Sequence, residues 1–156
     1  MIFFTHVIFG LLIALIYSLN VSVDVSLFFA VMLFGAALPD IDIGTSFLGR
    51  WIWPLNTAFF KHRGFFHSVP FLIIWAFVMN HFFGADAAVA AILGVGSHLL
   101  LDMLTPSGLR IFWPVGIEIR GRFKSGGLFD MFLFIVIAAA CFYIMHVTKF
   151  GLVNLS

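Results

Sequence analysis

The sequence predicts an all-α integral membrane protein that crosses the bilayer several times. Of its 156 residues, 63% are hydrophobic and only 10% are charged. A soluble domain carries charge on about a quarter of its residues, and 22 phenylalanines could not all be buried in a soluble protein of this size. The hydrophobic residues gather in about five long runs, as membrane helices require. The length suits a single membrane-embedded domain over residues 1–156.

We expect about five membrane helices, one for each apolar run: residues 2–19, 26–38, 70–83, 85–104 and 128–147. The second run is short for a bilayer, which takes about 20 helical residues. Pro39 ends it, because the residue before a proline disfavours helix. This helix either tilts and extends, or ends inside the protein at a polar pocket. In the third run, Ser68 suits the N-cap and Pro70 suits the first turn.

Two long connections join these runs. Residues 43–66 mix tryptophans and cations with apolar residues. This mixture predicts a short interfacial segment, because Trp and Arg favour the headgroup level. Residues 106–127 carry several more cations, and the alternation in Ile117-Glu118-Ile119-Arg120 indicates a small hairpin there.

The order of the runs brings most of the polar residues to one side of the membrane. With five spans, the N-terminus and both connections share a side, which then holds His6, Asp40, Asp42, His62, His67, His98 and Asp102. Seven of the eight Lys and Arg residues fall there too, and the other side holds only Lys149. The positive-inside rule therefore places this side in the cytoplasm. The formal net charge of +1 gives no reason to expect a nucleic-acid partner.

His98 and Asp102 are the strongest sign of a metal site. They are four residues apart on an expected helix and so share one face. A His and a carboxylate placed in this way could hold one metal from a rigid element. Ionisable groups in membrane segments are costly and usually functional. The alternative is a His–Asp hydrogen bond that holds two helices together.

Two further strings carry side chains that can bind a metal. Asp40 and Asp42 follow a proline at a helix end, and we expect Asp40 to be the first choice as a ligand. The alternative is turn formation or capping, which Asp favours. Gly64 allows a bend between His62 and His67 that could turn both inward. His67 is the better ligand because it lies at the mouth of a span, whereas His62 could instead be an interfacial residue.

The remaining ionisable residues give weaker signals. A single His near the start of a span, as His6 is, is more often an interfacial residue than a ligand. We expect His81 and His146, near the opposite side, to be interfacial as well. Asp130 is expected to act as an N-cap or a dipole partner of the fifth helix. Cys141 is the only cysteine, and we expect a buried, inert thiol.

The ligand types indicate the metal and the kind of function. A set of His and carboxylate ligands without Cys suits zinc first, with manganese and iron as alternatives, and we expect one or two divalent ions. Such a site could ionise a water near neutral pH. Three classes of function remain: a hydrolase, a protein that binds or transports metal without hydrolysis, and a membrane-anchored binding protein with a structural metal. The far halves of the expected helices are apolar, which favours a site on one side over a transport path.

Together these strings resemble a known family. Pro39-Asp40-Ile41-Asp42, His62-Arg63-Gly64 with His67-Ser68, and Ser97-His98 with Asp102 and Thr105 are similar in order and spacing to the YdjM-like membrane-bound metal-dependent hydrolases. The resemblance covers roughly residues 5–114. It implies a helical hydrolase of the cytoplasmic (inner) membrane of a bacterium or an archaeon.

A fainter similarity links the chain to the zinc-dependent phospholipase C and nuclease group. Those enzymes bind zinc through an early Thr-His, an Asp, a His and a His-x-x-x-Asp helix. Here the matching residues are Thr5-His6, Asp40, His67, and His98 with Asp102. This similarity adds His6 to the expected ligands. The later His-x-x-x-Glu ligands of that group have no counterpart, so a full three-metal cluster is not expected.

The expected reaction is hydrolysis of a phosphoester in a membrane lipid or another amphiphile. The expected metal ligands are His6, Asp40, His67, His98 and Asp102. Arg63, Asp42 and His62 form the expected catalytic group, in which Arg63 stabilises the negative charge of the transition state. Arg120, Arg122 and Lys124 are the expected substrate-binding cations, and the alternative is that they only set the topology.

Overall fold

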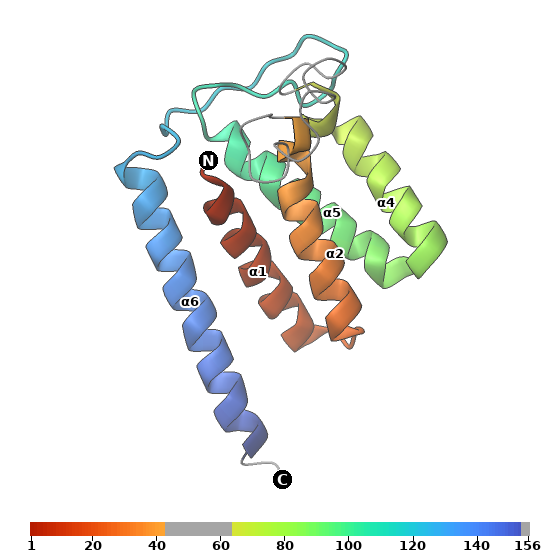
Figure 1. The fold of residues 1–156 in the computed structure, drawn as a ribbon, viewed down its shortest axis with the longest axis vertical. Coiled ribbons are helices and arrows are strands. Elements are labelled where there is room, and N and C mark those ends of the chain that lie inside the picture. Colours follow the sequence, from red (N-terminus) through yellow and green to blue (C-terminus); the bar gives the residue numbers. More distant parts are fainter. Residues whose placement is uncertain (43–63, 154–156) are drawn as a thin grey trace.

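The structure is a computed structural model that describes residues 1–42 and 64–153, and it shows a bundle of five α-helices (Figure 1). The helices and two short 3-10 helices follow one another as α1 (Phe3–Asn20), α2 (Val25–Ala37), η1 (Leu38–Asp42), η3 (Phe65–His67), α4 (Val69–Phe83), α5 (Ala85–Met103) and α6 (Leu128–Val153). The described residues contain no β-strand. The all-α fold class expected from the sequence is therefore confirmed.

The five helices match the five apolar runs, but they differ in length. Three are long and apolar enough to cross a membrane, namely α1, α5 and residues 128–148 of α6. Val25–Ile41 and Val69–Phe83 are apolar but shorter. Large hydrophobic side chains lie exposed along the outside of the bundle, among them Phe77 at 71% and Phe132 at 64%. Such a surface suits a lipid environment.

Helix α5 lies at the centre of the bundle and packs against α2 and α4 (Figure 1). On the other side of α2 lies α1, and α6 packs against α1. The helices run alternately up and down. As a result, one end of the bundle gathers the starts of α1, α4 and α6 and the ends of α2 and α5. We call it the polar end, because buried polar side chains such as those of His98 and Asp102 lie there.

Small residues bring α2 and α5 into backbone contact. A Cβ atom on Gly94 of α5 would lie 3.2 Å from the Ala36 nitrogen and 3.2 Å from the Gly35 Cα atom of α2. Any side chain at Gly94 would therefore force the two helices apart. Close packing at small residues is the usual way for membrane helices to associate, because lipid leaves no hydrophobic force between them.

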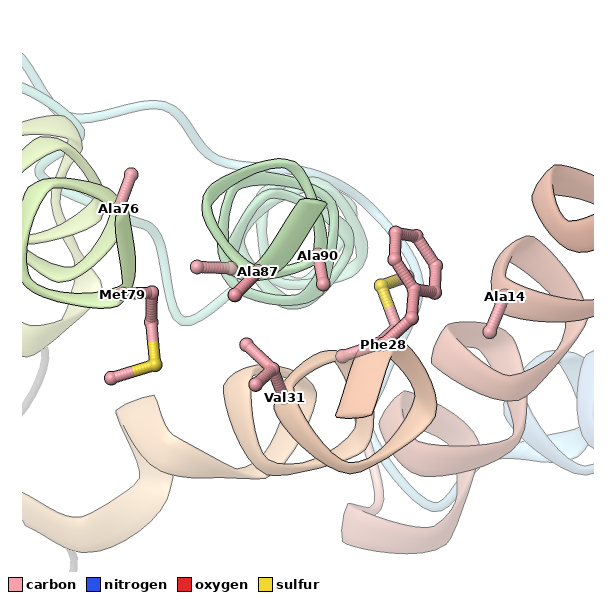
Figure 2. Packing of buried hydrophobic residues seen from close by; sticks show 9 residues of the cluster. Ala14, Phe28, Val31, Ala76, Met79, Ala87 and Ala90 are labelled. Carbon is pink, nitrogen blue, oxygen red and sulfur yellow. The ribbon is translucent and has the colours of Figure 1, made fainter. Parts of the chain in front are cut away.

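In the half of the bundle away from the polar end, the fully buried side chains of the described residues are apolar. A buried cluster joins α1, α2, α4 and α5 there, and Figure 2 shows it from close by. Its members are Ala14, Phe28, Val31, Met32, Ala76, Met79, Ala87, Ala90 and Ala91. The only ring among them, Phe28, stacks on Tyr17 with centroids 4.8 Å apart. This packing explains why the far halves of these helices consist mainly of apolar residues.

The connection between α5 and α6 forms less regular structure than a hairpin. Leu109 and Ile119 pair in an isolated antiparallel bridge, with N–O distances of 2.8 and 2.9 Å. The alternation at residues 117–120 thus marked the right position, but the pairing does not extend into strands. The interfacial segment expected at residues 43–66 lies, up to residue 63, outside the described residues.

The helix starts follow the local signals in part. Ser68 caps α4 and accepts a hydrogen bond from the Phe71 nitrogen at 3.4 Å, as expected. Asp24 caps α2 in the same way, accepting from the Leu27 nitrogen at 3.1 Å. Asp130, in contrast, is fully buried in the first turn of α6 and bonds to another helix. It therefore does more than serve the start of its own helix.

Candidate metal centre

The polar end holds every buried polar or charged side chain found in residues 1–42 and 64–153. These are Thr5, His6, Asp40, His67, Ser68, Ser97, His98, Asp102, Thr105 and Asp130. Burial of several ionisable groups away from water is costly unless they are paired or bind a metal. A concentration of them at one end of an apolar bundle therefore indicates a site.

His98 is oriented by the close packing of α2 on α5. Its Nδ1 atom donates a hydrogen bond to the Ala36 carbonyl of α2 at 2.7 Å. Once Nδ1 carries the proton, the lone pair lies on Nε2. This Nε2 atom is buried and has no hydrogen-bond partner among the described residues. Backbone bonds of this kind commonly fix the tautomer of a metal-binding His.

Asp40 and Asp102 each lie close to both His67 and His98. The Nε2 atom of His98 lies 3.7 Å from Asp40 Oδ1 and 3.9 Å from Asp102 Oδ2. The Nε2 atom of His67 lies 3.8 Å from Asp40 Oδ1 and 3.7 Å from Asp102 Oδ2. We call these four residues the four-donor group.

These separations are too long for hydrogen bonds and suit atoms that bind a metal ion. Hydrogen bonds between nitrogen and oxygen span about 2.7–3.2 Å. Two ligand atoms that each lie about 2.1 Å from a tetrahedral zinc are about 3.4 Å apart. The observed distances of 3.7–3.9 Å are close to that value and nearly equal to one another. The N–O distances of the four-donor group are therefore longer than hydrogen bonds and suit side chains that bind a divalent ion.

His6 extends the group on the other side of Asp102. Its Nε2 atom lies 3.4 Å from Asp102 Oδ1, and its ring stacks on the His98 ring with centroids 3.8 Å apart. The amino group of Met1 is 2.8 Å from the same oxygen. His6, His98 and Asp102 form one set of three potential ligands, and Asp40, His67 and His98 form another. The two oxygens of Asp102 face different histidines, so the arrangement can hold one ion or two neighbouring ions.

The chemistry of the donors also fits a metal. The site offers imidazole nitrogens and carboxylate oxygens, the ligands that zinc, manganese and iron share. The one thiol, Cys141, is buried in α6 and lies 3.8 Å from the Ile8 carbonyl, so it belongs to a helix contact. His81 and His146, expected to be interfacial, are exposed.

The structure brings together all five residues expected as metal ligands. They come from α1, η1, η3 and α5, and each is buried to at least nine-tenths. Of the expected catalytic group, His62 and Arg63 lie outside the described residues. The backbone of Asp42 ends η1, and its side chain also lies outside the described part. The roles of these three residues stay predictions.

The expected substrate-binding cations lie on a connection that is anchored beside the metal ligands. The Gly121 nitrogen donates to the Thr105 carbonyl, and the Phe123 nitrogen donates to the Leu104 carbonyl, both at 2.9 Å. A Cβ atom on Gly121 would overlap the backbone of Leu104, so only glycine fits there. Leu104 follows Asp102 by two residues, and Gly121 separates Arg120 from Arg122. The backbone that carries these cations is thus fixed to the end of α5.

Asp130 forms a buried tie that the sequence did not predict. It accepts hydrogen bonds from the Thr5 hydroxyl at 2.7 Å, the Ile2 nitrogen at 2.9 Å and the Gly126 nitrogen at 2.9 Å. The tie fixes the start of α6 to the residue directly before His6. A hydroxyl and a carboxylate at the same end of two apolar spans were the available signal. Nothing in the spacing showed that they meet.

Comparison with known proteins agrees with the membrane fold. The sequence model of the family described as "YdjM inner membrane protein" matches residues 1–155. The chain belongs to this family. The resemblance inferred from the motifs is therefore confirmed, and so is the membrane location that the family's description gives.

Named relatives of this YdjM-family chain come from several organisms. It is 43% identical over 96 residues to "Inner membrane protein YdjM" of Escherichia coli (strain K12), covering 56% of this chain and 47% of that protein. It is 29% identical over 116 residues to "Uncharacterized protein YvsG" of Bacillus subtilis (strain 168), covering 70% of this chain and 72% of that protein. A third relative, "Uncharacterized protein ORF4" of Methanothermobacter thermautotrophicus, is 42% identical over 65 residues, 41% of this chain and 25% of that protein.

The match thus spans about half the length of the Escherichia coli relative. No solved structure matches the fold. None of these findings supports the fainter similarity to the zinc-dependent phospholipase C and nuclease group.

Proposed function

We propose that this YdjM-family chain is a metal-dependent hydrolase that acts at the membrane edge on a phosphoester of a lipid or another amphiphile. The observation that carries the proposal is the buried His and Asp cluster, with N–O separations of 3.7–3.9 Å in the four-donor group and two sets of three potential metal ligands. A site built for a purely structural hydrogen-bond network would bring the same atoms to about 3 Å.

The chain's own residues would hold the metal and set its surroundings. Asp40, His67 and His98 would hold one zinc ion, and His6, His98 and Asp102 form a second set of donors. A divalent ion in this position would polarise a phosphoryl oxygen and lower the pKa of a water molecule. The Ala36 carbonyl would keep the lone pair of His98 directed at the ion.

The cations of the 104–127 connection support a phosphoester as the reacting group. A phosphoryl transition state spreads negative charge over its oxygens, and guanidinium and ammonium groups stabilise such charge. Arg120 is already paired with Glu118 at 3.0 Å. Arg122 and Lys124 are exposed and form no ion pair within the described ranges, so they would be available to an anionic substrate.

A membrane location next to lipid headgroups would supply such a substrate directly. Because most Lys and Arg residues fall on the polar end's side of the spans, we propose that the site faces the cytoplasm. The surface of that leaflet is negatively charged and attracts basic segments.

Metal transport without hydrolysis is the alternative, and the far half of the bundle argues against it. A transport path needs polar groups that continue across the membrane. Between α1, α2, α4 and α5 the described residues beyond the polar end form the apolar cluster of Figure 2. An ion held at the polar end would meet hydrocarbon in that direction.

The decisive experiment combines metal analysis with an activity assay on the purified chain. Wild-type protein should hold close to one or two zinc ions per chain, and His98→Ala and Asp102→Ala should each lose most of this metal. His81→Ala, an exposed histidine away from the polar end, is the matched control and should keep it. Metal-loaded wild-type protein should hydrolyse phospholipids or lipid phosphates. Metal transport into vesicles by a protein that cleaves no such substrate would replace the hydrolase proposal with the transport alternative.

A further inference from the structure

We infer that a groove between the first turns of α1 and α6 binds an acyl chain of an anionic lipid, whose phosphate contacts Arg122 and Lys124. The inference names the amphiphile on which the proposed hydrolase would act. That the bound lipid is a substrate rests on the proposed function, whereas binding of the lipid does not require a metal.

The groove is open to the side of the bundle and almost entirely apolar. It has a volume of about 250 Å³ and its apolar wall consists of Ile2, Phe4, Met131, Phe134 and Ile135. Pockets that enclose a whole drug-sized ligand usually have roughly 300–1,000 Å³. The groove is therefore too small for a complete amphiphile and suits one alkyl chain that enters from the lipid side.

The two polar residues of the groove do not oppose a hydrocarbon ligand. Thr5 and Asp130 line it as well, but the Thr5 hydroxyl donates to Asp130 Oδ1 and two backbone nitrogens donate to Asp130 Oδ2. Both side chains are buried. All of these polar groups would keep their hydrogen bonds when an alkyl chain occupies the groove.

The segment that borders the groove carries cations. The Gly126 nitrogen bonds to Asp130, and a Cβ atom on Gly126 would lie 3.9 Å from the Ile2 side chain, so this glycine borders the groove. The Gly127 nitrogen donates to the Lys124 carbonyl at 3.0 Å, which folds Lys124 back over the start of α6. Lys124 and Arg122, two residues before it, are exposed and make no ion pair with another described residue. An apolar groove below two unpaired cations complements an anionic lipid.

The groove and the metal donors share the same turn of α1. Thr5 lines the groove, and the next residue, His6, lies 3.4 Å from Asp102 on the other face of the helix. The cations belong to the connection that Gly121 fixes to the end of α5. A lipid seated in the groove would thus have its phosphate at the same end of the bundle as the metal ligands.

The test measures equilibrium binding of phosphatidylglycerol and of phosphatidylcholine with identical acyl chains to the full chain in detergent after chelation of metal. Wild-type protein should bind the anionic lipid at least about fivefold more tightly. Ile135→Trp fills the groove and should weaken phosphatidylglycerol binding at least about fivefold. Ile73→Trp adds the same ring to the outer surface of α4, where Ile73 is 60% exposed, and should change binding less than twofold.

Variants that remove a charge test the inference independently, because they leave the apolar wall of the groove unchanged. Arg122→Gln and Lys124→Gln should each reduce the preference for phosphatidylglycerol about twofold or more. Arg110→Gln, which removes an exposed charge elsewhere on the same connection, should leave it unchanged. Equal binding of the two lipids by wild-type protein, or equal loss with Ile73→Trp and Ile135→Trp, would show only the non-specific lipid that surrounds any membrane protein and would overturn the inference.

The same measurement on His98→Ala protein separates this inference from the proposed hydrolase. If selective lipid binding persists in His98→Ala and metal-loaded wild type hydrolyses no lipid, the groove would be supported as a lipid-binding site and the hydrolase proposal would be rejected. If wild type hydrolyses lipid and neither Ile135→Trp nor Lys124→Gln changes the rate, the hydrolase proposal would be supported. The groove would then be rejected as its lipid-binding site.

Discussion

Replacing Asp130 tests how strongly the buried tie holds α6 to the bundle. Asp130 is fully buried and accepts three hydrogen bonds, from Thr5, Ile2 and Gly126. Hydrogen bonds to a charged group contribute about 1.5–3 kcal/mol each, and contributions of neighbouring bonds are not additive. We therefore expect Asp130→Ala to lower the free energy of unfolding by about 3–5 kcal/mol, because the buried Thr5 hydroxyl and two partly buried backbone nitrogens would lose their acceptor.

Smaller changes at the same tie should have graded effects. Thr5→Val removes one of the three donors and should cost about 1–2 kcal/mol. Asp130→Asn keeps an acceptor oxygen but loses the charge, so its cost should lie between those of Thr5→Val and Asp130→Ala. Asp24→Ala is the matched control, because Asp24 is an exposed N-cap with one backbone partner. Its loss should cost about 1 kcal/mol.

The measurement is reversible unfolding in mixed micelles with a rising mole fraction of a denaturing detergent, followed by far-UV circular dichroism. The tie also positions the residue before His6, so Asp130→Ala should weaken zinc binding to the His6 side of the site more than to the four-donor group. The reasoning would be refuted if Asp130→Ala cost no more than Asp24→Ala, or if Thr5→Val had no measurable effect.

Three further predictions concern the packing, the connection and the topology. Gly94→Ala should lower the free energy of unfolding by about 1–3 kcal/mol, because its Cβ atom would strike the backbone of α2. It should also weaken zinc binding, since His98 bonds to that backbone. Gly96→Ala on the same helix meets only a side chain at 3.8 Å and should be neutral or stabilising in the same unfolding assay. Gly121→Ala should displace the cationic connection and reduce lipid hydrolysis at least about tenfold at unchanged metal content, whereas Gly116→Ala, whose Cβ atom meets nothing within 4 Å, should keep the activity. A reporter fused after Ser156 should be active only outside the cytoplasm, and activity in the cytoplasm would contradict the expected orientation.

The sequence by itself determined the class of the fold and the limits of its helices to within about one residue, except that α6 continues to Val153 instead of ending at residue 147. Long apolar runs predict membrane helices because each helix satisfies its own backbone hydrogen bonds in lipid. The run expected at residues 85–104 is α5 at Ala85–Met103, and the run expected at 26–38 is α2 at Val25–Ala37. Pro39 and Ser68 marked a helix end and a helix start correctly, since both act through neighbouring residues only.

The sequence also predicted which residues would gather at one end of the bundle. The alternation of the spans is enough to bring His6, Asp40, His67, His98 and Asp102 to the same side, and the structure places them together there. Their role as metal ligands stays a prediction. The roles of Asp42, His62 and Arg63 stay predictions as well, outside the part of the chain whose side chains the structure describes.

Only the tertiary structure decided how those residues face one another. The two oxygens of Asp102 face different histidines, and the Ala36 carbonyl directs His98, 62 residues further along the chain. Asp130 meets Thr5 across 125 residues. Helix periodicity fixes which side chains share a face of one helix, but not the rotation and depth at which two helices pack. Those depend on contacts such as Gly94 against α2, which are made between residues far apart in sequence and leave no local pattern.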